Sequence, residues 1–322
     1  MCKSDTGFLA RMQNVNLKKK NIKTRNGPDG IHLFDRNTGL NILLDDEIPH
    51  SDIWTKSPRQ VSIALTNLCN LKCSHCYAPK SKAFLDKEIV KLWMKELDLA
   101  GSFGIGFGGG EPTLHPDFYE LCQFGHNETS LAMTFTTHGH TLNDSLVTLI
   151  ENCIDFTRVS MDGVGKTYES IRGCSFEKFL EKISLLKGRV NFGINYVVNS
   201  QTIKDLEQAI HIAESYGASE FLFLPEEAVG LGNQVDTATI EQLSTWVSEY
   251  KGNIRLSISS VRKNSVNYLR ALDKEPEHLA YSHIDANGYL KKTSFEPSGY
   301  EITESGVMNS YKKLCNAEER II

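Results

Sequence analysis

The sequence lacks any apolar run close to the ~20 residues that a membrane-spanning helix needs. Its first residues carry no hydrophobic segment of the kind that signal peptides have. Internal repeats and low-complexity segments are missing as well. These absences predict a cytoplasmic protein with no membrane partner.

Excess positive charge is also missing. The 322 residues carry a formal net charge of −5, and the one clear basic run is "LKKKNIKTRN" near the N-terminus. A short run of this kind is typical of a solvated chain end. Nucleic-acid binding requires a basic face, so we expect no nucleic-acid partner.

A disulfide framework is the third absence, because only three of the eight cysteines are close together. Cys69, Cys73 and Cys76 lie within eight positions, and such a cluster in a large cytosolic chain indicates a metal or redox site. One interpretation is a closed zinc site with His75 or a distant histidine as fourth ligand. The other is a [4Fe–4S] cluster with one iron left open. His75 adjoins Cys76, and this makes shared coordination of one ion awkward.

Strand-like and helical patterns alternate from about residue 60 to about 250. The expected strands are 61–65, 105–108, 131–137, 155–161, 190–198 and 220–224, and the expected helices are 85–101, 116–124, 143–152, 166–187 and 202–216. This alternation predicts an α/β protein with a parallel sheet and helices outside it. The sheet is either doubly wound or a (β/α) barrel.

The two ends of the chain have β character. Strand-like runs flank "RNTG" between residues 30 and 46, and "ANG" interrupts another pair within 281–295, so each end predicts a β-hairpin. A final helix is expected in "ESGVMNSYKKL". We therefore expect an N-terminal extension over 1–59, a core over 60–250 and a C-terminal extension over 251–322.

The stretch "CNLKCSHCY" resembles the CxxxCxxC signature of the radical S-adenosylmethionine (radical SAM) superfamily. It is most similar to the branch with the pyrroloquinoline-quinone, molybdenum-cofactor and peptide-modifying enzymes. The resemblance implies a [4Fe–4S] cluster on Cys69, Cys73 and Cys76, with SAM chelating the fourth iron. It places His75 beside the adenine and implies an electron donor such as flavodoxin or ferredoxin. The implied fold is a partial (β/α)6 TIM-type barrel.

The run "GIGFGGGE" contains a second motif. It matches the dinucleotide pattern G-x-G-x-x-G, but Pro112 and Pro116 delay the helix that this pattern should open. The glycines Gly109 and Gly110 with Glu111 are instead similar to the superfamily motif that binds the methionine amino group. A carboxylate can pair with an ammonium there. The alternative is a tight turn with a solvated glutamate.

Further cofactor contacts are expected after later strands. Ser160 and Asp162 in "RVSMDG" are two apart, so both are expected to point to one face and to hold ribose hydroxyls. Arg172 is similar to the family residue that pairs with the cofactor's carboxylate. The alternatives are a helix N-cap for Asp162 and a surface ion pair for Arg172.

Two later strands add candidates. Asn195 or Asn199 is expected near the cofactor, with a strand-end turn and helix cap as the alternative. The resemblance implies that the backbone near Leu224 and Pro225 lies against the adenine. All these motifs follow the C-terminal ends of predicted strands, where a (β/α) barrel builds its active site.

Two departures from the family pattern stand out. His138 in "TTHG" replaces the asparagine of the "TNG" common in relatives, either as a local change or as a substrate contact. The tail resembles the SPASM/twitch domains, but Ser282, His283, Thr293 and Ser294 stand where those domains have cysteines. Hydroxyls are poor iron–sulfur ligands, so we expect no auxiliary cluster.

The implied activity is reductive cleavage of SAM to a 5′-deoxyadenosyl radical that abstracts hydrogen from a substrate. We expect a peptide substrate, with the N-terminal hairpin positioning it by edge addition. The alternatives are a small metabolite, such as a sugar or nucleoside, and a non-enzymatic iron–sulfur sensor. An epimerase would need a thiol hydrogen donor, for which Cys174 and Cys315 are candidates.

Overall fold

A ten-stranded sheet, in the order β10-β9-β8-β7-β6-β5-β4-β11-β12-β13, forms the centre of the computed structural model. The structure describes residues 21–259 and 266–319. The strands of this sheet are β4 (Gln60–Thr66), β5 (Gly104–Gly109), β6 (Ala132–Thr137), β7 (Phe156–Ser160), β8 (Phe192–Val198), β9 (Glu220–Pro225), β10 (Arg255–Ile258), β11 (Tyr281–Ile284), β12 (Tyr289–Lys291) and β13 (Tyr300–Glu301). The six strands predicted from alternation are confirmed as β4 to β9. Each runs parallel to its neighbour.

Two further parallel strands extend this core. Strand β10 pairs with β9, and β11 of the C-terminal hairpin pairs in parallel with β4. The predicted hairpin is therefore confirmed as β11–β12, but its first strand belongs to the barrel sheet. The sequence analysis missed β10 because its four residues alternate too briefly to give a pattern. Within the described residues β10 and β11 do not pair, so the barrel is partial and open.

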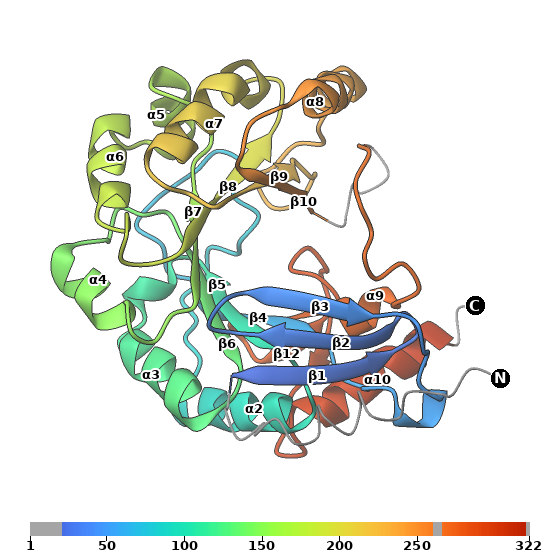
Figure 1. Ribbon diagram of the computed structural model, residues 1–322. Helices are drawn as coiled ribbons and strands as arrows, with labels where there is room; N and C mark the ends of the chain where they lie inside the picture. The colour runs from blue at the N-terminus through green and yellow to red at the C-terminus, as the bar shows by residue number, and fades with distance from the viewer. Residues whose placement is uncertain (1–20, 260–265, 320–322) are drawn as a thin grey trace.

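Helices follow the strands around the outside of the sheet, as Figure 1 shows. They are α2 (Lys87–Leu99), α3 (Phe118–Glu128), α4 (Asp144–Ile150), α5 (Lys166–Arg172), α6 (Phe176–Ser184), α7 (Leu206–Ser215), α8 (Thr237–Glu249), α9 (Glu277–Ala280) and α10 (Val307–Glu319), with 3-10 turns η1 (Ser51–Ile53), η2 (Pro112–Leu114) and η3 (Thr202–Asp205). None of the described helices has the length and apolar character to cross a membrane.

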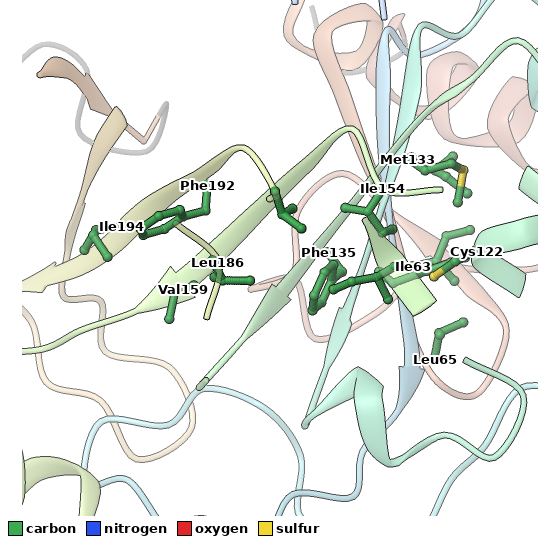
Figure 2. Close-up of a cluster of buried hydrophobic side chains, with 14 of the residues drawn as sticks. Ile63, Leu65, Cys122, Met133, Phe135, Ile154, Val159, Leu186, Phe192 and Ile194 are labelled. Atoms are coloured by element: carbon green, nitrogen blue, oxygen red, sulfur yellow. The ribbon is translucent and has the colours of Figure 1, made fainter. Parts of the chain in front are cut away.

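The core lies between the sheet and these helices. Figure 2 shows apolar side chains of β4, β6, β7 and β8 gathered in one cluster, among them Ile63, Phe135 and Val159. Alternation along each strand then directs the other residues, such as Ser62, Thr134 and Arg158, to the opposite face. That inner face of the partial barrel carries these polar side chains together with apolar ones such as Phe156 and Leu222.

The helix expected over 166–187 is interrupted. It ends at Arg172, where Gly173 caps it in the left-handed conformation with φ 69°, and α6 begins after Ser175. The Ser175 hydroxyl accepts a hydrogen bond from the Lys178 backbone and so caps the second helix. The prediction of one helix was wrong because the apolar spacing continues across the break. The break places Arg172 at the end of a helix and close to the cysteine loop.

The N-terminal segment is a three-stranded antiparallel sheet of β1 (Ile22–Gly27), β2 (Gly30–Asp35) and β3 (Leu40–Leu44). The predicted hairpin is confirmed as β2–β3, and β1 was missed. Two buried arginines attach this sheet to the barrel. Arg25 donates to the carbonyls of Ser57 and Gly101, and Arg36 donates to those of His126, Thr129 and Leu131.

These carbonyls belong to segments that precede β4, β5 and β6. The N-terminal sheet therefore covers the end of the barrel where the strands begin. The candidate site lies at the other end, where the strands finish. Edge addition of a substrate strand to this hairpin would hold the substrate away from the site.

Candidate functional site

The loop that carries the three cysteines leaves the end of β4, and its last residues return to that point. A bridge pairs Thr66 with Phe84, and Asn67 donates from its backbone to Ala83 at 3.2 Å and from its side chain to Ser81 at 2.9 Å. The loop over 67–83 is thus closed at its base. Its cysteine side chains are free thiols, of which Cys73 is buried while Cys69 and Cys76 are half-buried.

Cations lie next to two of these thiols. The Arg172 guanidinium lies 3.7 Å from Cys73 Sγ, and Lys80 Nζ lies 3.0 Å from Cys76 Sγ. Burial raises the pKa of the Cys69 and Cys73 thiols, whereas Arg172 opposes this effect at Cys73. A neighbouring cation favours the thiolate, which is the form that binds metal.

The donor set fits a multi-iron cluster. Among the described residues, no group of three His, Cys, Asp or Glu side chains converges as the ligands of one metal ion do. In an iron–sulfur cluster each cysteine binds a different iron, so three thiolates on one loop need not converge. The Nε2 atom of His75 lies 3.1 Å from Asp162 Oδ2, so this imidazole is engaged elsewhere than at the thiols.

The glycines Gly109 and Gly110 let the end of β5 lie directly against the cysteine loop. Gly110 donates to Thr66 O at 2.8 Å, and Glu111 donates to Leu68 O at 2.7 Å. A Cβ on Gly110 would meet Leu68 O at 2.1 Å, and one on Gly109, whose φ is +110°, would meet Thr66 O at 2.2 Å. The sequence led us to expect that these glycines let a ligand approach the backbone. In the structure it is the cysteine loop of the same chain that approaches them.

Glu111 is fully buried. Its carboxylate accepts hydrogen bonds from Thr113 Oγ1 at 2.7 Å, from Thr137 Oγ1 at 3.0 Å and from the His138 backbone at 2.9 Å. Burial raises the pKa of this carboxyl, although the hydrogen bonds oppose the shift. A cationic group placed beside Glu111 would therefore relieve the cost of keeping it ionised. The alternative of a solvated glutamate is excluded by its burial.

Asp162 and Arg172 form a buried ion pair beside the loop. Asp162 is fully buried and accepts from Arg172 Nη2, from His75 and, at 2.8 Å, from the Val197 backbone. Burial alone would raise the pKa of Asp162, but Arg172 and His75 hold it well below its usual range. The surface ion pair considered for Arg172 is thus wrong. Strand β7 ends at Ser160, so strand alternation does not extend to Asp162.

Ser160 and Asn195 are register partners on the inner face of β7 and β8. Ser160 is half-buried, and the Oδ1 atom of Asn195 is buried with no hydrogen-bond partner. The same is true of His75 Nδ1 and Arg172 Nε. Buried polar atoms are normally satisfied, so the unsatisfied atoms of His75 and Arg172 at the cysteine loop and of Asn195 on β8 are groups that a bound ligand would complete.

The remaining strand-end residues divide into two groups. Leu224 and Pro225 lie opposite Val197 and Val198 at the end of β9, on the same edge as Asn195. Asn199 instead caps the turn that follows β8, because its Oδ1 accepts from Thr202 N, and its amide donates to Glu226 at 2.7 Å. Asn199 is thus engaged within the chain, whereas the Asn195 Oδ1 atom has no hydrogen-bond partner.

Sequence reasoning missed the segment that covers the cysteine loop. After β9, Leu231 donates its backbone N–H to Cys76 O at 3.0 Å. A Cβ on Gly230 would meet Cys76 O at 2.6 Å, and one on Gly232 would meet His75 O at 3.4 Å. The signal was present in "AVGLGN", since closely spaced glycines mark a close backbone approach. Its partner Cys76 is 155 positions before Leu231, and such a distant partner cannot be read from the pattern.

The two candidate hydrogen donors lie in different parts of the structure. Cys174 is in the turn between α5 and α6, two residues after Arg172. Cys315 lies on α10, which packs against α2, β12 and β13. Both side chains are half-buried. Only Cys174 adjoins a residue of the site, and the donor role stays a prediction for both.

The inner face of the sheet carries a hydrogen-bonded chain between β11 and β4. Tyr281 donates to Ser62 Oγ at 2.7 Å, and Ser62 Oγ lies 2.6 Å from His283 Nδ1. Further along, Arg158 and Arg255 both pair with Glu220 at 2.9 Å. His283, at a position where the SPASM/twitch resemblance led us to look for a cluster ligand, thus belongs to the barrel lining.

Acid should weaken the fold through His283. Burial lowers its pKa to about 4, against about 6.5 for an exposed histidine. Between these values the unfolded chain binds more protons, so stability is full above about pH 6.5 and falls as the pH drops towards 4. We expect the loss in free energy of unfolding between pH 7 and pH 5 to be about 2 kcal/mol smaller in His283→Gln. Urea titrations at the two pH values measure it, with the exposed His211→Gln as control. Equal losses in His283→Gln and wild type would contradict the prediction.

Comparisons with known proteins identify the class. Residues 63–213 match the family model described as "Radical SAM superfamily". The match confirms the resemblance to the radical SAM superfamily for this stretch of the chain.

Two relatives illustrate its range. The AdoMet-dependent heme synthase of Methanosarcina barkeri is 25% identical over 218 residues, which are 64% of this chain and 62% of that protein. Mycofactocin maturase of Mycobacterium ulcerans is 29% identical over 164 residues, which are 48% of this chain and 44% of that protein. The chain thus spans less than two thirds of the length of each. Both names are those of enzymes.

Solved structures share the fold. Streptococcus suis SuiB bound to the precursor peptide SuiA superimposes with a TM-score of 0.74 at 13% identity, over 91% of this chain and 87% of that one. The enzyme anSMEcpe with AdoMet and the Cp18Cys peptide gives 0.62 at 19% identity, over 79% and 80% of the two chains. At these identities the likeness concerns the fold alone, and it includes the regions beyond the matched domain.

Proposed function

We propose that the protein is a radical SAM enzyme with one [4Fe–4S] cluster on Cys69, Cys73 and Cys76. When bound, the reduced cluster supplies the electron that cleaves SAM to methionine and a 5′-deoxyadenosyl radical, which takes hydrogen from a substrate C–H bond. The observation that carries this proposal is the combination of three free thiols on one loop with the buried Glu111 and with the unsatisfied polar atoms of His75 and Arg172.

Each residue has a role that its surroundings support. Glu111 would hold the methionine ammonium, because a buried carboxylate is stabilised by a cation. Arg172 has an unsatisfied Nε for the cofactor's carboxylate, and Ser160 and Asn195 would meet the ribose. His75, Leu224 and Pro225 would lie against the adenine.

Asp162 would act through its neighbours. It holds both Arg172 and His75 in place, so its loss would disturb two contacts at once. A direct contact with the ribose remains part of the proposal. Electrons would arrive from a flavodoxin or ferredoxin, and the exposed Lys72, Lys80 and Lys82 of the cysteine loop would favour such an acidic carrier.

A peptide is the substrate that we favour. Two structures of the same fold are titled as peptide complexes, and one relative is named as a maturase. A small metabolite is the second candidate, supported by relatives named as probable GTP 3′,8-cyclases. A non-enzymatic iron–sulfur sensor is the third.

Anaerobic reconstitution tests this proposal. We expect about four irons per chain, one [4Fe–4S] cluster, and 5′-deoxyadenosine formation when dithionite and SAM are added. Cys73→Ala should lose both. About eight irons would contradict the single cluster, and a full cluster without 5′-deoxyadenosine would favour the sensor. A ribosomally made precursor peptide encoded nearby, modified in the same assay, would distinguish peptide from metabolite.

A further inference from the structure

His138 connects the cysteine loop to Glu111. It follows β6 and is buried, with 5% of its surface exposed. Its Nε2 atom lies 2.7 Å from Asn70 Oδ1 and 3.3 Å from Glu111 Oε2. Its backbone N–H donates to the same Glu111 oxygen at 2.9 Å. One residue thus contacts both the proposed ligand loop and the proposed ammonium site.

The hydrogen bonds determine which ring nitrogen carries the proton. The backbone N–H of His140 donates to His138 Nδ1 at 3.0 Å, so Nδ1 is an acceptor. Nε2 therefore carries the hydrogen and donates to Asn70 Oδ1, with Glu111 as a second, longer acceptor. Burial, with Arg172 nearby, lowers the pKa of His138 to about 4, in agreement with a neutral ring.

Cys69 is consequently held from both sides. Before it, Leu68 O accepts the Glu111 backbone N–H at 2.7 Å. After it, Asn70 is held by His138. Both anchors lead to the end of β5 and to Glu111, so they fix the distance between this thiol and that carboxylate. Without the His138 anchor, the exposed Asn70 would lose this contact, and the chain after Cys69 would keep the hydrogen bond that Cys69 Sγ accepts from Leu71 N at 3.4 Å.

We propose that His138 is a positioning residue that fixes Cys69 relative to Glu111 through its Nε2–H. The inference rests on the proposed function, in which Cys69 binds iron and Glu111 binds the SAM ammonium. His138 would act on iron and SAM through its contacts with Asn70 and Glu111. His138 would act through geometry. SAM would be chelated by the iron on Cys69 and held by Glu111, so its binding requires a fixed distance between Cys69 and Glu111.

Two substitutions distinguish the role of Nε2 from that of Nδ1 in His138. In His138→Gln the amide nitrogen can occupy the place of Nε2 and keep the donation to Asn70. In His138→Asn the shorter side chain keeps an acceptor near Nδ1 but does not reach Asn70. We expect His138→Gln to bind SAM like wild type, and His138→Asn to bind it about tenfold more weakly, the equivalent of one lost hydrogen bond.

The readouts are iron per chain after reconstitution, the dissociation constant of SAM by calorimetry, and the change in the cluster's electron paramagnetic resonance spectrum on adding SAM. Asn70→Ala should reproduce the His138→Asn effect, and the double variant should be no worse than either single variant. Asn70 is exposed, so its replacement keeps the test valid even if His138 variants fold poorly.

The outcomes separate the inference from the proposed function. A wild type that assembles no cluster or forms no 5′-deoxyadenosine would refute the proposed function. A wild type that does both, beside His138→Asn and Asn70→Ala variants with unchanged SAM affinity and spectra, would overturn the role of His138 alone. Additive effects in the double variant would also overturn it.

Discussion

Gly110→Ala is expected to prevent stable cluster assembly. The added Cβ would lie 2.1 Å from Leu68 O and 2.6 Å from the Leu68 carbonyl carbon, both backbone atoms. The backbone next to Cys69 must therefore move, and it would also lose the hydrogen bond between Glu111 N and Leu68 O. We expect less than half of the wild-type iron and labile sulfide after reconstitution. Overpacking of this kind also costs about 1–3 kcal/mol of stability, measurable by urea unfolding.

Gly108→Ala is the matched control, because it makes the same change two residues earlier in the same run. No atom lies within 4 Å of a Cβ at Gly108, and its φ is not positive. This variant should assemble the cluster like wild type. If both variants lost iron equally, the contact with Leu68 would not be the cause. If Gly110→Ala kept its iron, the close packing of this motif on the loop would have no role in assembly.

Asp162→Ala is expected to destabilise the protein by about 3–5 kcal/mol, because it leaves the buried Arg172 charge without its partner. His75 loses its carboxylate contact in the same variant. The free energy of unfolding of the protein without iron, from urea titration, measures this effect separately from cluster loss. We also expect SAM binding to be lost after reconstitution.

The control is an exposed ion pair. Asp144 pairs with Arg189 at 2.7 Å, and 79% of the Asp144 side chain is exposed. Asp144→Ala should cost at most about 1 kcal/mol, since exposed pairs are screened by water. Similar losses of unfolding free energy in Asp162→Ala and Asp144→Ala would show that the buried Asp162–Arg172 pair stabilises the protein no more than an exposed pair does. A stable Asp162→Ala variant with normal SAM affinity would contradict its proposed role.

Local pattern was sufficient for much of the fold. The six strands β4 to β9 follow from short apolar runs. Four described helices, α2, α4, α6 and α8, begin after a residue whose side chain caps them, such as Asp86 and Asn143. The three cysteines predicted a metal loop by chemistry and spacing. These features depend on neighbours in the sequence, so a single chain is enough to find them.

Local pattern failed where the partner of a residue is distant. It joined α5 and α6, because apolar spacing continues past Gly173, while the left-handed cap decides the end. It did not place β11 beside β4, since alternation gives no strand order. The sequence pattern predicted Glu111 and Asp162 as cofactor-binding residues. It did not predict the hydrogen bonds and the ion pair within the chain that accompany their burial.

The sequence by itself determined the class of the protein: a parallel α/β core with a thiolate loop at the end of its first barrel strand. The tertiary structure alone decided how that loop is held. Arg172, His138 and Leu231 reach it from segments that follow three different strands, and their contacts span from 68 to 155 positions of the chain. The physical reason is that parallel strands bring their carboxyl ends to one edge, where packing and hydrogen bonds, not sequence spacing, select the partners.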